Sequence, residues 1–431
     1  MRTTAAIILI FGICFFWSCP LSAEQGGTVV VVKVSGVINP VSAEFIRKGL
    51  GTAEGMKAEA VVIELDTPGG LDASMRSIVK DILACNVPVV TYVYPPGARD
   101  ASAGVFITMA SSVAAMAPGT NIGAAHPVSL GEKMDKTSTE KAVNDAAAYI
   151  RALAVRNGRN ADWAENSVRN SISATENEAL KEGVIDFVSR DLPSLLKDID
   201  QKKVITASGE RVLRTANALV INREMDLRYK ILYFLSDPSV AYLLMLLGFY
   251  GLFFELSNPG SILPGVAGAI FLILAFYSFQ TLPVNYAGLL FIVLALVLFI
   301  LEIKIISHGV LATGGVISMV MGSLMLFESP APFLRLSIYL VLPAAATTAL
   351  FFTFTVRLAY KASLRRPTTG REGLVGTKGR ALADFLDGEG TVAVHGEIWA
   401  AVSRDNVKKN DIVVVESVSG LTIQVKKKEE A

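Results

Sequence analysis

The sequence predicts three structural regions: an exported α/β domain, a multi-span helical membrane region and a small closed β-barrel. Three observations support this fold class. β-Branched apolar runs alternate with helical patterns over residues 24–205, which is typical of a largely parallel sheet. Five long apolar stretches follow within residues 238–357, and each can cross a hydrocarbon core about 30 Å thick. Short strands separated by turns fill residues 368–431, as in small barrels of the OB type.

The composition indicates a membrane protein. Of the 431 residues, 52% are hydrophobic and 18% are charged, which is more apolar than an ordinary soluble protein. The formal net charge of +1 gives no reason to expect nucleic acid as a partner. Cys14 and Cys19 lie at the extreme N-terminus, so Cys85 is alone in the rest of the chain and no disulfide framework is expected.

Residues 1–23 have the pattern of a secretory signal peptide. Arg2 supplies a positive charge, an apolar core runs from Ala5 to Trp17, and the small residues of Leu21-Ser22-Ala23 form a cleavage site before Glu24. An uncleaved membrane anchor is the alternative interpretation. Under either interpretation, the residues that follow are expected to be exported from the cytoplasm.

Residues 24–205 alternate between strand and helix patterns. Strands are expected over 28–34, 60–65, 87–94 and 113–117. Helices are expected over 43–58, 74–84, 103–111 and 140–156. A further helix begins after Thr175, because Thr175 and Glu178 match a capping box.

Residues 206–237 are interpreted as a linker with a possible helix around 225–235, and the membrane region follows. Its five apolar stretches cover 238–256, 263–282, 284–302, 309–327 and 336–356. The short gaps between them predict an antiparallel bundle of about five spans. One span followed by a re-entrant hairpin is the alternative for the first two stretches.

The charge pattern predicts the orientation in the cytoplasmic (inner) membrane. Clustered Lys and Arg favour the cytoplasmic side, and four such residues follow the last span: Arg357, Lys361, Arg365 and Arg366. Five spans also place the two soluble regions on opposite sides. The domain of residues 24–205 is therefore expected outside the cytoplasm, and the barrel of residues 368–431 inside it.

The residue inventory of the exported domain limits its possible chemistry. His126 is its one histidine, because His308 falls at a membrane boundary and His395 in the barrel. With one histidine and Cys85, the usual zinc ligand set is missing, so no metal or other cofactor is expected. A serine nucleophile would need His126 or a lysine as its base. A lysine can act so only if burial lowers its pKa from about 10.4.

Ser102 is the best candidate nucleophile in the sequence. It lies in Asp100-Ala101-Ser102-Ala103-Gly104, where small neighbours permit a tight turn, and free N–H groups of a helix starting there could stabilise an oxyanion. A simple helix cap is the alternative role. Gly69 and Gly70 follow a buried strand and would let backbone N–H groups approach a substrate carbonyl, although Pro-Gly-Gly also marks ordinary turns. For the base, spacing alone does not choose among Lys133, Lys136 and Lys141.

An ordered set of motifs resembles the long form of the NfeD family, which comprises membrane-bound serine proteases with a ClpP-like domain. The motifs are Asp66-Thr67-Pro68-Gly69-Gly70, Tyr92-Val93-Tyr94-Pro95-Pro96-Gly97, Ala101-Ser102-Ala103-Gly104 and Ala117-Pro118-Gly119-Thr120-Asn121-Ile122-Gly123-Ala124. The likeness continues through Ala148-Tyr149-Ile150-Arg151, Gly158-Arg159-Asn160-Ala161 and residues 178–186, and then covers the membrane region and the barrel.

The resemblance implies a ClpP/crotonase fold and a Ser–Lys dyad made of Ser102 and Lys141. It also implies an oxyanion hole formed by the backbone N–H groups of Gly70 and Ala103, with Gly69 giving room. The implied substrate is a hydrophobic segment of a stomatin-like membrane partner. A dimer or larger homo-oligomer in contact with membrane lipid is also implied.

Three other functions are weighed against a serine endopeptidase. A catalytically silent scaffold for a stomatin-like complex is the main alternative, and the presence of both Ser102 and a suitably placed lysine argues against it. Acyl-CoA chemistry on the crotonase fold is disfavoured, because an exported site meets little CoA. A transporter is disfavoured because Glu255, Glu302 and Lys304 are the charged residues of the spans and all lie near their ends.

Overall fold

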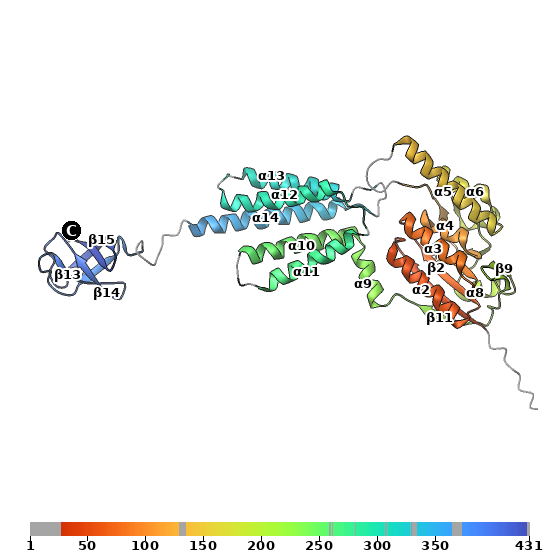
Figure 1. Cartoon of the computed structure of the whole chain (residues 1–431), viewed down its shortest axis with the longest axis horizontal. Coiled ribbons are helices and arrows are strands. Elements are labelled where there is room, and N and C mark those ends of the chain that lie inside the picture. The colour runs from red at the N-terminus through yellow and green to blue at the C-terminus, as the bar shows by residue number, and fades with distance from the viewer. Residues whose placement is uncertain are drawn as a thin grey trace, which may run out of the picture. The chain divides into compact units, whose positions relative to one another are not determined.

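A computed structural model describes residues 27–128, 135–257, 260, 262–280, 282–305, 307, 309–327, 329, 334–363 and 373–428 (Figure 1). The predicted signal peptide and Lys133 lie outside these residues. The chain divides into two compact units, Met1–Leu294 with Ser318–Ala344 and Ala295–Ile317 with Ala345–Ala431.

The first unit contains the predicted α/β domain, which is built on a six-stranded parallel sheet. Its strand order is β11-β1-β2-β3-β5-β8. The strands are β1 (Thr28–Ser35), β2 (Ala60–Asp66), β3 (Val89–Val93), β5 (Val113–Met116), β8 (Phe187–Val188) and β11 (Leu219–Arg223). The four strands predicted from apolar runs are confirmed. β8 and β11 complete the sheet at its edges, and β11 comes from the segment interpreted as a linker.

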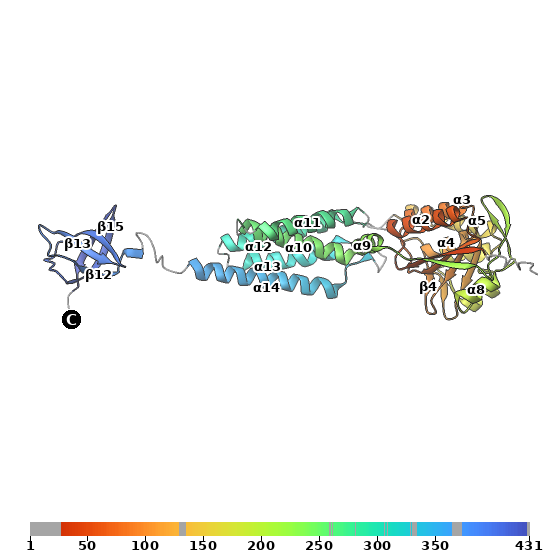
Figure 2. The same cartoon turned by 90° about the horizontal axis from the view of Figure 1, so that it is seen from below.

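Both faces of the sheet are buried, as the continuous apolar runs of its strands require. Val30, Val32 and Ile63 pack on one face with α2 (Pro40–Met56), α3 (Asp72–Ala84) and α4 (Ala103–Ala110). Val29 and Val31 pack on the other face with α8 (Leu192–Asp198). Figure 2 shows α2 and α3 on the side of the sheet opposite α8. Each fully buried Val or Ile contributes about 1.5–3 kcal/mol to folding.

Further elements extend this domain. α5 (Lys136–Arg156) packs on α6 (Ala161–Arg169) and on α4. A small sheet has the order β4-β6-β7, from Arg99–Ala101, Asn121–Gly123 and Ser173–Thr175. The capping box predicted at Thr175 and Glu178 is present at the start of α7 (Glu176–Lys181). β9 (Lys203–Thr206) and β10 (Gly209–Val212) form a hairpin, and α9 (Leu227–Leu235) confirms the helix expected near residues 225–235.

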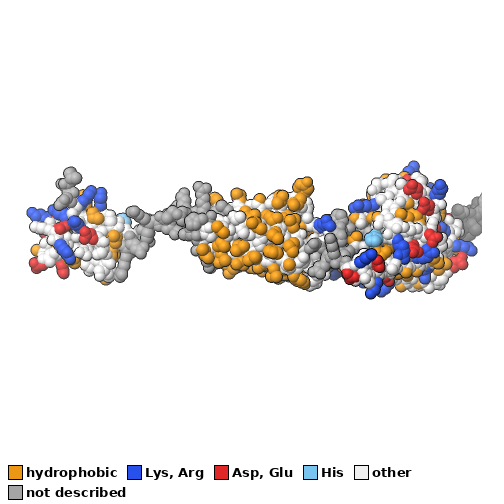
Figure 3. Space-filling model, turned by 90° about the horizontal axis from the view of Figure 1, so that it is seen from above, with side chains coloured by type: hydrophobic (Ala, Val, Ile, Leu, Met, Phe, Trp, Pro, Cys, Tyr) orange, Lys and Arg blue, Asp and Glu red, His pale blue; other side chains and the backbone are white. Residues whose placement is uncertain are grey.

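Five apolar helices follow, in agreement with the five predicted stretches. They are α10 (Pro238–Ser257), α11 (Ile262–Phe279), α12 (Tyr286–Lys304), α13 (Val310–Leu326) and α14 (Ile338–Ser363). By length and composition Pro238–Leu256 and Ile262–Phe279 can each cross a membrane, and Tyr286–Glu302, Val310–Leu326 and Ile338–Phe352 are shorter apolar helices. Figure 3 shows their surface as almost uniformly apolar, in contrast with the mixed charges of the α/β domain.

The C-terminal part of the second unit is a closed five-stranded barrel with the order β12-β13-β14-β16-β15. Its strands are Lys378–Ala381, Glu389–Val394, Glu397–Val402, Thr422–Lys427 and Ile412–Ser419 in that order. Val392, Val413 and Ile423 are fully buried in its core. The prediction of a small closed barrel is therefore confirmed.

Candidate active site

Ser102 lies in a strained turn between a strand and a helix. β4 ends at Ala101, α4 begins at Ala103, and Ser102 between them has φ 54° and ψ −109°. Residues other than glycine rarely adopt a positive φ, so the surrounding structure must enforce this backbone conformation. Pairing of β4 with β6 provides part of that support, and the N–H of Ser102 donates to the carbonyl of Gly123 at 3.1 Å.

The turn after β2 packs directly against Ser102. Gly69 has φ +112°, and a Cβ built on it would lie 2.6 Å from the Cβ of Ser102 and 3.1 Å from its Oγ. Thr67 holds this turn, because its Oγ1 accepts from the N–H of Gly69 at 3.0 Å and donates to the Gly69 carbonyl at 3.1 Å. Thr67 also binds β4, since its carbonyl accepts from the N–H of Ala101 at 3.1 Å. The two predicted motifs therefore meet at one place.

The predicted oxyanion donors lie in the two backbone turns that meet at Ser102, at Gly70 and at Ala103. The N–H of Leu71 donates to the Ile38 carbonyl and the Gly69 carbonyl accepts from the Ile38 N–H, so this pairing directs the intervening N–H of Gly70 away from Ile38. Ala103 is the first residue of α4, where N–H groups have no acceptor within the helix. Both groups can donate to an oxyanion, as an acyl-transfer site requires.

A buried carboxyl group underlies the Ser102 turn. Asp100 is fully buried, its Oδ2 accepts from Thr108 Oγ1 at 2.7 Å, and its Oδ1 has no hydrogen-bond partner among the described residues. Burial raises the pKa of Asp100 to about 7, although the Thr108 hydrogen bond opposes the shift. Gly104 leaves room for this carboxyl, because a Cβ there would lie 1.9 Å from Oδ1. Sequence reasoning did not single out Asp100, since no local pattern distinguishes a buried aspartate from an exposed one.

A second buried residue fixes the far end of α4. The Arg159 guanidinium donates to the carbonyls of Thr108 and Met109 at 2.8 and 3.1 Å and forms an ion pair with Asp186 at 3.0 Å. The Arg159 side chain is 3% exposed. The helix that begins beside Ser102 is therefore held at both ends by polar contacts far apart in the sequence.

Lys141 lies near the N-terminal end of α5, and its side chain is exposed. Among the described residues it forms no ion pair and no hydrogen bond through its side chain. Lys136 is also exposed, at the first position of the same helix. The rival base His126 is half-buried, and its Nδ1 lies 2.8 Å from the Val168 carbonyl, so one ring nitrogen is engaged in a structural contact.

A chain of ionic contacts connects the helix of Lys141 with the start of α3. Arg76 on α3 lies 2.8 Å from Asp72 and 2.5 Å from Asp145 on α5. The Arg76 guanidinium also lies over the Tyr149 ring, 4.7 Å from its centroid. Asp145 is four residues after Lys141, so both occupy the same face of α5. The Arg76–Asp145 contact therefore ties α5 to α3, the helix that begins just after Gly70 and Leu71.

Three family models match consecutive parts of the chain. They are described as the NfeD1b N-terminal domain over residues 28–192, the NfeD integral membrane domain over residues 239–358 and the NfeD-like C-terminal, partner-binding domain over residues 371–427. The chain is therefore a membrane protein, and its terminal barrel corresponds to a region named for binding a partner.

Two curated relatives match nearly the whole chain. Membrane-bound protease PH1510 of Pyrococcus horikoshii is 36% identical over 97% of this chain and 97% of its own length. Membrane protein NfeD1b of Bacillus subtilis is 25% identical over 93% of this chain and 92% of its own length.

Similar solved structures include the 1510-N membrane-bound stomatin-specific protease, a lysine-to-alanine mutant in complex with a substrate peptide. It is 37% identical with a TM-score of 0.46, and covers 48% of this chain and 97% of the solved one. ClpP1 from Listeria monocytogenes is 19% identical with a TM-score of 0.32, and covers 37% of this chain and 91% of the solved one. The predicted order of an α/β domain, apolar helices and a closed barrel is confirmed by the elements described above.

Proposed function

Because the chain belongs to the NfeD family, we propose that it is a membrane-bound serine endopeptidase with Ser102 as nucleophile and Lys141 as general base. The turn at Ser102 carries this proposal. A strained serine between a strand and a helix lies against the glycine turn of Gly69 and Gly70, which is an arrangement that suits acyl transfer. In this proposal the backbone N–H groups of Gly70 and Ala103 serve as the donors to the oxyanion.

The proposed reaction proceeds through an acyl-enzyme. Neutral Lys141 accepts the proton of the Ser102 hydroxyl as Oγ attacks the scissile carbonyl carbon. The N–H groups of Gly70 and Ala103 donate to the resulting oxyanion. The lysine ammonium then protonates the leaving amine as the C–N bond breaks. A water molecule, deprotonated by the lysine, finally hydrolyses the Ser102 ester and releases the second product.

The exposed position of Lys141 sets a condition on this mechanism. An ammonium group in water keeps its proton at neutral pH, and burial lowers the pKa of a lysine. We therefore expect a peptide bound along the Ser102 turn to cover Lys141 and exclude water from it. The contacts of Arg76 with Asp72 and Asp145 support this assignment, because they tie the helix that carries Lys141 to α3, whose start follows the turn of Gly70.

The proposed substrate is a hydrophobic segment of a stomatin-like membrane protein. The partner-binding description of the barrel match supports a protein partner, and the Pyrococcus horikoshii protease is described as stomatin-specific. Extended apolar peptides also suit a site that lies beside strand edges. The same partner could remain bound without cleavage, which would make the chain a scaffold.

We propose the following domain organisation for the chain. A cleavable signal peptide covers residues 1–23 and a protease domain covers 24–205. A linker over 206–237, a membrane region over 238–357 and a barrel over 368–431 follow. The protease domain would lie outside the cytoplasmic membrane and the barrel inside, as the four cations after the last span indicate. Assembly as a dimer or larger homo-oligomer is part of the same proposal.

Cleavage of apolar peptides by the full-length protein in lipid nanodiscs tests the proposal. The wild type should cut, whereas Ser102→Ala and Lys141→Ala should each lose at least about 100-fold in kcat/KM, and Lys136→Ala should retain full activity. Lys136 is a matched control because it is an exposed lysine on the same helix. No cleavage by the wild type over a broad peptide set would favour the scaffold. Full activity of Lys141→Ala would reject the dyad.

A further inference from the structure

α9 presents two apolar faces, and the protease domain covers one of them. Tyr229 is 3% exposed, and its ring lies 5.6 Å from that of Phe45 on α2. Leu232 and Tyr233 pack against the same core from the next turn. These three positions fall on one side of the helix, so α9 is fixed to α2 although it lies outside the sheet.

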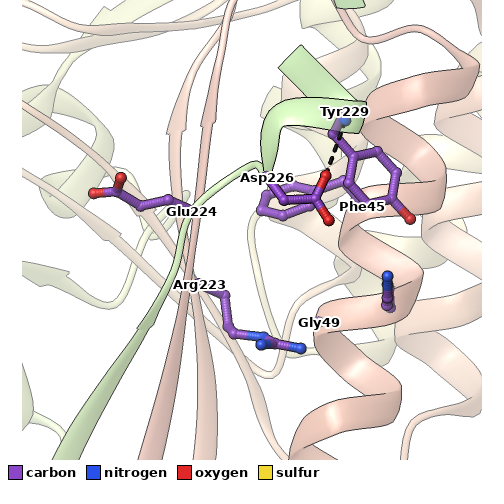
Figure 4. Close-up of a pocket in the computed structure, with 7 residues that line it drawn as sticks. Phe45, Gly49, Arg223, Glu224, Asp226 and Tyr229 are labelled. Carbon is purple, nitrogen blue, oxygen red and sulfur yellow. Dashed lines mark hydrogen bonds between the residues drawn. The ribbon is translucent and has the colours of Figure 1, made fainter. Parts of the chain in front are cut away.

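Polar contacts fix the start of α9 in the same place. Asp226 is its N-cap and accepts from the N–H of Tyr229 at 3.0 Å, as the dashed line in Figure 4 shows. Lys48 of α2 lies over the Tyr229 ring, 5.2 Å from its centroid. The cavity beside them, about 140 Å³ in volume, is lined by Lys48, Arg223, Glu224 and Asp226. The positive charges of Lys48 and Arg223 offset the negative charges of Glu224 and Asp226. The lining therefore gives no net charge that would select a charged ligand.

The opposite face of α9 exposes a stripe of three large apolar side chains. Leu227, Ile231 and Phe234 are 74%, 50% and 63% exposed. Their spacing of four and three residues aligns them along one side of the helix. Arg228 and Lys230 are exposed on either flank of this stripe. An apolar stripe bordered by cations is the pattern of a helix that lies in a membrane surface.

The apolar stripe adjoins the membrane region directly. α9 ends at Leu235, α10 begins at Pro238, and the match to the integral membrane domain starts at residue 239. Asp237 precedes α10 and caps its first turn, because the Asp237 Oδ1 accepts from the N–H of Ser239 at 2.7 Å. α9 packs against both α10 and α11, and it crosses the direction of α10 instead of continuing it (Figure 1). α9 therefore lies next to the N-terminal end of the first helix of the membrane region.

We propose that α9 is an interfacial helix whose stripe of Leu227, Ile231 and Phe234 inserts into the headgroup–acyl boundary of the bilayer. Arg228 and Lys230 face the lipid headgroups on either side. Since the other face of α9 is fixed to α2, insertion holds the whole α/β domain at one height above the membrane. The lipid contact itself does not depend on protease chemistry.

Site-specific fluorescence in the full-length protein tests this proposal. In a variant with Cys14, Cys19 and Cys85 changed to Ser, the single substitutions Leu227→Cys, Ile231→Cys and Phe234→Cys would each carry an environment-sensitive dye. Glu210→Cys is the matched control, because Glu210 is an exposed residue on β10 in the same domain. The proteins are reconstituted in phosphatidylcholine–phosphatidylglycerol vesicles, with or without lipids that carry a nitroxide at the headgroup or high on the acyl chain.

Dyes at 227, 231 and 234 should emit at shorter wavelength than the dye at 210 and lose at least about half of their intensity to the shallow nitroxide lipids. The dye at 210 should be quenched only by a water-soluble quencher. Equal behaviour at all four positions would overturn the proposal. Shielding of the stripe in detergent together with crosslinking between copies would overturn it in favour of a protein–protein interface. Unchanged thermal unfolding of the labelled variants shows that the fold is intact, and peptide cleavage is not needed as a readout.

Discussion

Gly69 and Ser102 are in direct contact across two segments that are 33 residues apart in the chain. A Cβ on Gly69 would lie 2.6 Å from the Cβ of Ser102. Real Cβ atoms do not approach other heavy atoms so closely, so any side chain at position 69 must displace the serine. The positive φ of Ser102 adds strain that the surrounding packing must maintain.

Gly69→Ala should therefore abolish peptide cleavage and destabilise the protease domain by about 1–3 kcal/mol. Gly97→Ala is the matched control, because Gly97 also has a positive φ but a Cβ there would meet nothing within 4 Å. Gly97→Ala should lose comparable stability and keep its activity. Thermal unfolding and kcat/KM would be measured for both variants. Equal kcat/KM of the Gly69→Ala and Gly97→Ala variants would show that the contact between position 69 and Ser102 is unimportant for peptide cleavage.

Arg76→Gln should lower kcat while changing stability by less than about 1 kcal/mol, since its ion pairs are partly exposed. The expected cause is loss of the contacts that hold the Lys141 face of α5 near α3. Arg151→Gln is the control, because Arg151 lies on α5 itself and pairs with Asp162 and Glu165 of α6, not with α3. Steady-state kinetics would separate kcat from KM. A similar loss in both variants would indicate general loosening of α5 and would count against positioning by Arg76.

The buried carboxyl of Asp100 should make stability depend on pH. Burial raises the pKa of Asp100 from 3.8 to about 7 in the folded protein, so the native state keeps a proton that the unfolded chain has lost. Stability should then fall as pH rises from about 4 to about 7, by at most about 4 kcal/mol, and stay reduced above that range.

Asp100→Asn has no proton to lose, so this fall should disappear in the variant. Glu182→Gln, at an exposed position, should keep the pH profile of the wild type. Denaturant unfolding of the isolated protease domain at pH 4.5, 6 and 8 would provide the comparison. A parallel profile for wild type and Asp100→Asn would contradict a neutral buried acid.

Patterns that act over a few neighbouring residues made much of the fold predictable. β1, β2 and β3 follow from β-branched runs, and the start of α7 follows from the capping box at Thr175. β4, β6 and β7 were not predicted, because three residues are too few to show a period of two. The segment of β11 was interpreted as part of a linker, because its five residues, Leu219–Arg223, include polar ones. In the structure this strand lies at the edge of the sheet and is mostly exposed.

The candidate site was predictable only in part. The small residues around Ser102 and the pair Gly69-Gly70 indicated two tight turns, and the family resemblance joined them. The strained φ of Ser102 and the buried Asp100 depend on contacts between segments distant in the sequence, and no local pattern encodes them. Arg159 appeared only as part of a motif, and its bonds to the end of α4 became visible when the helices were placed.

Trapping of the acyl-enzyme tests the central role of Ser102 most directly. Full-length protein in nanodiscs would be mixed with an apolar peptide ester and quenched in acid within milliseconds to seconds. Intact mass and peptide mapping would then locate any added acyl group. A mass increase on Ser102 in the wild type, with none in Ser102→Ala, is the predicted result. Peptide cleavage with no adduct on Ser102, or an adduct on another residue, would contradict the proposed mechanism.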